Sequence, residues 1–304
     1  KKRLKMKKIY EDSKKIRLDK YLSLNLKHSR TEINKIINSG SVTINSKVIT
    51  KQSALLKLND VIVFEEISKD DKPIKINSNF KLNVIYEDDD LIVISKESGI
   101  SVHPSFNSNS ETIVDLLLKS FPDISKVGEK NRPGIVHRID KGTSGLMVIA
   151  KKIKILEDLK NQFKERKVLK EYVAIVHGIT KVKGIIDAPI GRHPTNRKKR
   201  ALISSGKNAY TSYEKIENKN DLSFLKVAIQ TGRTHQIRVH LSSIGHPIYG
   251  DTMYSRKFKN SKDRMLLHSY RLKFFHPVKK IYIDLKDKIP EEFGNHFRTK
   301  GKVI

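Results

Sequence analysis

The first regular hydrophobic pattern in the chain predicts two short helices. Apolar residues recur at three- and four-residue spacing over residues 16–26, and again over residues 33–37. Ser29 is the expected N-cap of the second helix, because Glu32 follows it three residues later as in a capping box. Gly40 is the expected C-cap, since glycine readily takes the left-handed conformation that ends many helices.

A small sheet is expected to follow these helices. Apolar residues flank a turn at Asn45-Ser46 within residues 42–49, which predicts a hairpin, and LNDVIVF at 58–64 predicts a closing strand. Residues 16–64 therefore form one compact module. Residues 1–15 are interpreted as a basic arm with little order, and residues 65–79 as a linker without apolar periodicity.

A second, larger domain is expected over residues 80–290, with a C-terminal tail at 291–304. Its apolar runs predict more strands than helices, and the strands often follow each other as hairpins. Strands are expected at 82–87, 91–96, 146–150, 170–178, 211–217, 223–230, 271–276 and 280–285, and helices at 112–121, 154–168 and within 232–245. Thr112 or an earlier serine is the expected cap of the first of these helices. The predicted fold class is α+β, with a mainly antiparallel mixed sheet in the second domain.

The net charge of the chain indicates the kind of partner that it binds. The chain carries 62 Lys and Arg against 33 Asp and Glu, a formal net charge of +29. A codon bias toward Lys, Ile and Asn would exchange Arg for Lys, but it would not create such a surplus of cations. A polyanionic partner is therefore expected. A membrane surface is the weaker alternative, because no basic amphipathic helix of clean periodicity stands out.

Composition also excludes several classes of protein. The chain has no cysteine, which rules out disulfides, zinc-thiolate and iron–sulfur sites, and a cysteine nucleophile. No apolar run is long enough for a membrane span, and the basic start lacks the apolar region of a signal peptide. A cytoplasmic protein is expected.

The first candidate site is the polar, glycine-punctuated loop at 137–145, directly before the buried strand at 146–150. Asp140 lies between Arg138 and Lys141, and neighbouring cations keep a carboxylate ionised, so it suits a nucleophile or a base. A charged surface turn that contains an ion pair is the alternative interpretation.

Two basic segments are further candidates. Residues 232–240 hold two arginines and two histidines that suit a phosphate clamp or a carboxylate partner, although a solvent-facing helix start remains an alternative. The histidines lack the spacing of a metal site, so no metal is expected. Residues 192–200 contain no acid and are expected to touch a nucleic-acid backbone.

Five segments together resemble the RluA family of RNA pseudouridine synthases. They are KESGISVHPS, PGIVHRIDKGTSGLMVIAK, KEYVAIVHG, TGRTHQIRVHLSSIGHPIYGD and LLHSYRLKFFHPV, and the resemblance covers about residues 80–290. Residues 16–64 resemble the RNA-binding module named after ribosomal protein S four. That pairing is typical of the large-subunit rRNA branch, and PIGRHPTNRKKRALI is similar to its RluD-type members.

The resemblance implies an isomerase that converts uridine to pseudouridine without a cofactor. Asp140 would be the catalytic aspartate, attacking C1′ or acting as a base, Arg233 would pair with it, and Tyr172 would stack on the target base. Gly142, Glu97 and Ser98 depart from the common motif without touching these positions. Further RNA contacts are expected from Arg17, Lys20, Lys27, Arg30, Lys35, Arg138, Arg192, Arg197, His235 and Arg238.

The implied partner is 23S rRNA or a precursor of the large ribosomal subunit, bound by a monomer. The stem-loop called helix sixty-nine is the expected target. Other 23S or tRNA uridines, or a ribosome-assembly factor that has lost catalysis, are the alternatives. In the N-terminal module, Ser46 and Asn59 replace turn glycines, so positive φ angles are expected at both positions.

Overall fold

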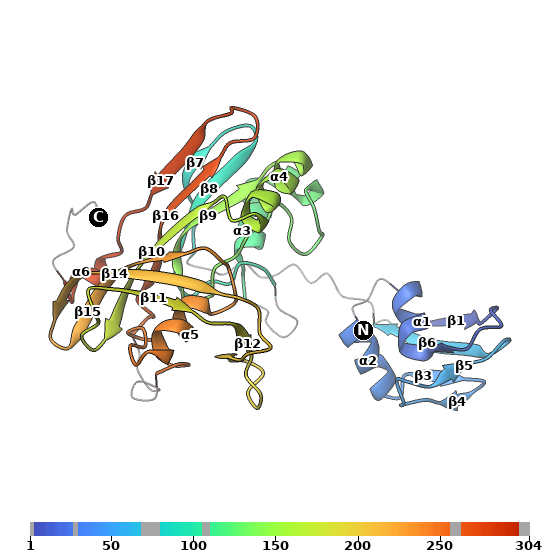
Figure 1. The fold of residues 1–304 in the computed structure, drawn as a ribbon. Helices are drawn as coiled ribbons and strands as arrows, with labels where there is room; N and C mark the ends of the chain where they lie inside the picture. Colours follow the sequence, from blue (N-terminus) through green and yellow to red (C-terminus); the bar gives the residue numbers. More distant parts are fainter. Residues whose placement is uncertain (1–2, 27–29, 68–79, 105–109, 256–262, 298–304) are drawn as a thin grey trace. The chain divides into compact units, whose positions relative to one another are not determined.

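The computed structural model describes residues 3–26, 30–67, 80–104, 110–255 and 263–297. The chain divides into two compact units, residues 1–75 and 76–304, whose ribbons are drawn in Figure 1. The predicted N-cap Ser29 and residues 68–79 of the predicted linker lie outside the described residues.

The first unit is the predicted module of two helices and a small sheet. Its helices are α1 (Leu18–Asn25) and α2 (Arg30–Asn38), and their apolar faces share one core with the strands. The main sheet has the order β1-β6-β3-β4, and β2 pairs with β5. Their bounds are β1 Arg3–Ile9, β2 Ile16–Arg17, β3 Val42–Ile44, β4 Lys47–Val48, β5 Leu55–Leu56 and β6 Val61–Ile67.

The turn of the predicted hairpin lies where expected. Asn45 and Ser46 have φ angles of 50° and 67°, and Asn59 has 68°. These are the left-handed conformations that a glycine would adopt at less cost. The side chain of Asn45 offsets part of this conformational free energy, because its Oδ1 accepts a hydrogen bond from the backbone N–H of Val61 at 2.8 Å.

The expected lack of order was wrong for residues 3–9, and the linker was placed three residues too early. Residues 3–9 form β1, which pairs antiparallel with β6 from Arg3 opposite Ile67 to Ile9 opposite Val61. Residues 65–67, expected to be linker, continue β6. The hydrogen bonds that order β1 come from a strand distant in sequence, so the local surplus of lysine gave no sign of them.

The second unit contains a nine-stranded sheet in the order β11-β14-β15-β10-β16-β9-β8-β7, with β17 paired to β16. All pairs are antiparallel except β9 with β16. This confirms the predicted mixed, mainly antiparallel sheet. The bounds are β7 Asn83–Glu87, β8 Leu91–Lys96, β9 Ser144–Ala150, β10 Leu169–His177, β11 Lys183–Asp187, β14 Tyr210–Lys219, β15 Leu222–Ile229, β16 Leu267–Phe275 and β17 Tyr282–Lys286.

Helices cover both faces of this sheet. On one face, α3 (Ile113–Ser120) and α5 (Gln236–Ser243) share a core with the strands, and on the other face α4 (Ile153–Lys164) does so. Thr112 caps α3 in a capping box with Asp115, as predicted for Thr112. A short 3₁₀ helix, η1, follows at Pro122–Lys126. None of the helices in the described part of the chain is long and apolar enough to cross a membrane.

Two further segments have structure that the sequence did not predict. The basic run at 192–200 joins β12 (Ile190–Arg192) to β13 (Arg200–Leu202) as a hairpin. The described part of the predicted tail contains α6 (Glu291–Gly294), and Phe293 and Phe297 are fully buried against Phe224. This part of the tail is therefore packed into the second unit.

Candidate active site

Two of the three candidate segments meet in one cavity of about 540 Å³. The loop at 136–143, before β9, supplies one part of the wall, and residues 229–238, from the end of β15 into α5, supply another. Lys170 and Tyr172 of β10, Leu267 of β16 and the C-terminal end of α4 complete the lining. Backbone from four distant parts of the chain thus converges at one site.

Asp140 faces this cavity with a side chain that is 17% exposed. Its Oδ2 accepts a hydrogen bond from Nη1 of Arg238 at 3.1 Å, and Nε2 of His235 lies 3.9 Å from the same oxygen. A turn fixes the backbone, since the N–H of Thr143 donates to the carbonyl oxygen of Asp140 at 3.0 Å. The carboxylate is therefore held by one close cation but remains open to the cavity.

A buried lysine holds the backbone next to Asp140. Nζ of Lys96 donates hydrogen bonds to the carbonyl oxygens of Glu97, Ile100 and Lys141 at 2.7, 3.0 and 3.2 Å. Burial lowers the pKa of Lys96 to about 7, because the charged form loses its hydration. This side chain ties the loop after β8 to the residue that follows Asp140.

Arg238 is shared between two carboxylates. Its Nε and Nη2 donate to the two oxygens of Asp251 at 2.7 and 3.0 Å, while Nη1 reaches Asp140. The guanidinium lies 5.0 Å from the centroid of the Tyr254 ring. Burial opposes its charge, but the hydrogen bonds to both carboxylates raise the pKa of Arg238 above its usual value. The fork geometry of arginine suits this arrangement, which a lysine could not reproduce.

The predicted pairing of Arg233 with Asp140 was wrong. Helix α5 begins only at Gln236, so Arg233 lies in the turn before it. Nε of Arg233 donates to the carbonyl oxygen of Asn208 at 3.0 Å, and its backbone N–H donates to Oε1 of Gln236. Arg233 lines the cavity, but Arg238, predicted as an RNA contact, makes the ion pair.

Tyr172 presents its side chain to the same cavity and is 7% exposed. Burial raises the pKa of Tyr172 to about 12; the Ser269 hydroxyl opposes this shift and the charge of Asp140 adds to it. The phenol is therefore neutral at ordinary pH. A ring at this position suits stacking on a planar base better than proton abstraction.

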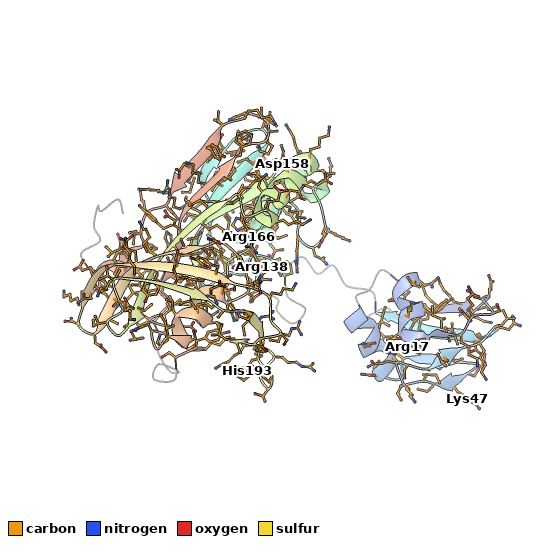
Figure 2. The ribbon with its side chains drawn as sticks, viewed as in Figure 1. Arg17, Lys47, Arg138, Asp158, Arg166 and His193 are labelled. Carbon is orange, nitrogen blue, oxygen red and sulfur yellow. The ribbon has the colours of Figure 1, made fainter. Side chains whose placement is uncertain are left out.

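The remaining predicted RNA contacts occupy different surroundings. Arg138 is exposed at the cavity, with Nη1 2.8 Å from Nε2 of His103, and Arg192 and Arg197 are exposed on the β12–β13 hairpin. Figure 2 labels Arg138, and it labels His193 on that hairpin. His235 instead packs inside the cavity, where its Nδ1 lies 2.8 Å from the Tyr254 hydroxyl.

The predicted contacts of the first unit are described only in part. Arg17 forms an ion pair with Asp19 at 2.9 Å, and Lys20 is exposed on α1. Lys27 lies outside the described residues, and only the backbone of Arg30 and Lys35 is described, within α2.

Sequence reasoning missed Lys96, Lys170, Asp251 and Tyr254, although each lies within or next to a segment it singled out. The sequence marks the motifs that contain these residues, but it does not show their individual roles. Those roles depend on which side chains the fold brings into contact with them. The described residues also include one group that could hold a metal: Asp88, Asp90 and His276. Lys279 and Lys152 pair with Asp88 and Asp90 at 2.8 Å each, which indicates structural ion pairs that join the β7–β8 turn to the β16–β17 turn and to the start of α4.

Comparison with known proteins adds two family matches. Residues 90–243 match the family described as RNA pseudouridylate synthase, and residues 16–62 match the S4 domain. The first match contains Asp140, Tyr172 and Arg238.

Individual relatives agree with these matches. The chain is 40% identical over 289 residues to an uncharacterized RNA pseudouridine synthase of Aquifex aeolicus, covering 91% of both proteins. It is 36% identical to ribosomal large subunit pseudouridine synthase D of Vibrio cholerae, covering 87% of this chain and 84% of the relative. The solved structure of human RNA pseudouridylate synthase domain containing 1 is similar, with a TM-score of 0.58 and 26% identity over 70% of this chain and 86% of that one.

Proposed function

The chain belongs to the family of RNA pseudouridylate synthases, and from that premise we propose that it converts uridines of 23S rRNA to pseudouridine, with the helix sixty-nine stem-loop as its target. Relatives from Vibrio cholerae and Pseudomonas aeruginosa that carry a large-subunit name support this choice of RNA. The N-terminal S4 domain and the net charge of +29 support a large polyanionic substrate. We place the reaction in the cytoplasm.

The observation that carries the proposal is the setting of Asp140. Among the described residues that line the cavity, it is the one carboxylate, and Arg238 holds it in place. The reaction breaks the N1–C1′ bond, turns the base and joins C5 to C1′, while N1 gains a proton and C5 loses one. An ionised carboxylate beside the ribose can attack C1′, or remove the 2′ proton on the way to a glycal.

Neighbouring residues serve this step in different ways. Arg238 orients the carboxylate through its hydrogen bond, and Tyr172 stacks on the detached base while it turns. The target uridine must leave its stack to reach a cavity of this size, so a single-stranded loop or base flipping is required. Arg138, Arg192, Arg197, Arg17 and Lys20 are assigned to backbone phosphates, because they are cationic and at least partly exposed.

The sharpest test replaces the carboxylate while keeping its shape. Asp140→Asn should abolish release of tritium from C5-labelled uridine in rRNA transcripts, since an amide is neither a nucleophile nor a useful base. Filter binding should show RNA affinity unchanged or tighter, because a negative charge has left a site for a polyanion. Asp123→Asn, on the exposed surface of η1, is the matched control and should leave both measurements unchanged.

Substantial tritium release by a folded Asp140→Asn protein would end this mechanism. Mapping pseudouridine in rRNA and tRNA from cells with and without the gene tests the substrate separately. Loss of a modification in tRNA alone would replace the 23S assignment. Full modification without the gene would favour an RNA-binding assembly factor.

A further inference from the structure

The cavity around Asp140 holds many more cations than acids. One carboxylate faces it, and the cationic side chains among its described lining residues are Arg138, Lys164, Arg166, Lys170, Arg233 and Arg238. Arg238 is already neutralised by Asp140 and Asp251. The charge of the other five is not balanced by an acid in the cavity wall, so an anion is expected to enter with the substrate.

Of these five cations, Lys170 has the strongest need for a counter-ion. Its side chain is 7% exposed, and no ion pair joins it to an acid in the described part of the chain. Its Nζ donates one long hydrogen bond, 3.4 Å, to the carbonyl oxygen of Gln230, and it lies 5.7 Å from the centroid of the Phe163 ring. Burial, together with the nearby charge of Arg166, lowers the pKa of Lys170 to about 8. A buried ammonium without an anion is costly for the free protein.

Lys164 and Arg166 also line the cavity, and the charge of Arg166 acts on Lys170. They lie at and just after the end of α4, while Phe163 of the same helix stacks on His137 at 4.4 Å. Figure 2 labels Arg166 and Arg138, which both line this cavity. The nearest acid in sequence, Glu165, is already paired with Lys167 at 2.7 Å.

Stabilisation of a helix end explains only part of this cluster. Cations in the last turn of a helix interact favourably with its dipole, which accounts for Lys164 and Arg166 without any ligand. It does not account for Lys170, because that residue belongs to strand β10 and is buried. A ligand therefore explains Lys170 better than helix capping does.

We propose that Lys170, with Arg166 and Lys164, forms a subsite for one phosphodiester of the substrate RNA, next to the uridine that reacts at Asp140. This inference rests on the proposed function. Uracil is neutral and cannot balance the buried ammonium, whereas the ribose of every internal nucleotide carries a phosphate on each side. Tyr172 lies two residues beyond Lys170 on the same strand and faces the same cavity, so a base stacked on its ring brings its own phosphates close to Lys170.

The test removes the charge from the protein and from the RNA in turn. The probe is the shortest rRNA stem-loop that the wild-type protein modifies, made with a neutral methylphosphonate at one phosphate at a time around the target uridine. On the unmodified RNA, Lys170→Met should weaken binding by about tenfold or more, since a charge-assisted hydrogen bond is lost. On the RNA with the methylphosphonate at the contacted position, wild type and Lys170→Met should bind equally.

Three controls separate this contact from a structural role. Lys219→Met removes the same charge from an exposed position at the far end of β14 and should bind like wild type. Lys170→Arg keeps the cation and should recover much of the affinity. Wild-type affinity should fall as pH rises through about 8, because the neutral amine cannot bind the phosphate, and Lys170→Met should lack this step.

Equal loss by Lys170→Met on every RNA, with or without a methylphosphonate, would overturn the subsite. So would a Lys170→Met protein that binds like wild type. Both outcomes differ from failure of the proposed function, in which the wild-type protein forms no pseudouridine in any rRNA.

Discussion

At the scale of single residues, Arg238 determines whether Asp140 has a partner. Arg238→Met would leave two carboxylates near one another without their cation, and removing one member of a buried pair costs about 3 kcal/mol or more. We expect a lower free energy of unfolding in urea and at least a roughly 10²-fold loss in the single-turnover rate. Arg233→Met should keep the stability and most of the rate, because its guanidinium contacts a backbone carbonyl.

Comparable losses for both arginine variants would contradict this division of roles. The sequence alone did not show which of these two arginines pairs with Asp140. The segments around Asp140 and residues 232–240 were recognised from their polarity and glycines, but the two arginines are five residues apart in one motif. Which of them meets Asp140 depends on the helix starting at Gln236 and on His235 adopting a φ of 59°. A one-dimensional pattern does not set that start.

Substitutions at Tyr172 distinguish a stacking role of its ring from proton transfer by its hydroxyl. With a pKa of about 12, its phenol is a poor base at neutral pH. Tyr172→Phe, which keeps the ring, should therefore lose far less than the roughly 10²-fold typical of a general acid–base group. Tyr172→Ala removes the stacking face and should lose roughly tenfold to a hundredfold. Tritium release under single turnover measures both, and a Phe variant as poor as the Ala variant would assign the hydroxyl a chemical role.

At the scale of elements, the parallel contact between β9 and β16 depends on Gly145. This residue has a φ of 107°, and a Cβ there would overlap the carbonyl oxygen of Ser269 and lie 2.7 Å from its nitrogen. Gly145→Ala should lower the free energy of unfolding by about 3 kcal/mol or more, as backbone strain and a steric clash combine. Gly142→Ala is the matched control, since its Cβ would meet only the flexible Met265 side chain at 3.4 Å or beyond. Equal stability of both variants in urea would show that the sheet adjusts without cost.

Helices and strands that are specified by neighbouring residues in the sequence were predictable. Those that depend on pairing with a strand distant in the sequence were not. The apolar stripe and the cap at Thr112 specify α3 from neighbouring residues alone. Strand β1 carries a basic sequence and is ordered by pairing with β6. The β12–β13 hairpin likewise sits in a basic run, where charge dominates the pattern that would otherwise mark two strands.

At the scale of the whole molecule, the S4 domain and the cavity around Asp140 belong to two compact units, each with its own core. Among the described residues, the core of the first unit, from Tyr10 to Phe64, shares no residue with the cores of the second unit. A protein that begins at residue 76 should therefore fold and retain the Asp140 cavity. It should bind rRNA more weakly, with a flatter dependence of log affinity on log salt, because phosphate contacts are lost.

Single-charge variants of the full chain show whether α1 makes such contacts. Lys20→Gln, on the exposed side of α1, should reduce the salt slope by about 0.7 to 0.9, the effect of one phosphate contact. Lys47→Gln is the control, because it removes the same charge from the exposed strand β4. Figure 2 labels both Lys47 and Arg17, the residue just before α1, and Lys47 lies away from it. Lys47→Gln should leave the slope unchanged, because a general loss of charge does not remove a specific contact. Equal slopes for Lys20→Gln and the wild-type protein would exclude this face of α1 as an RNA contact. Unchanged binding and turnover by the protein that begins at residue 76 would show that the second unit recognises rRNA unaided.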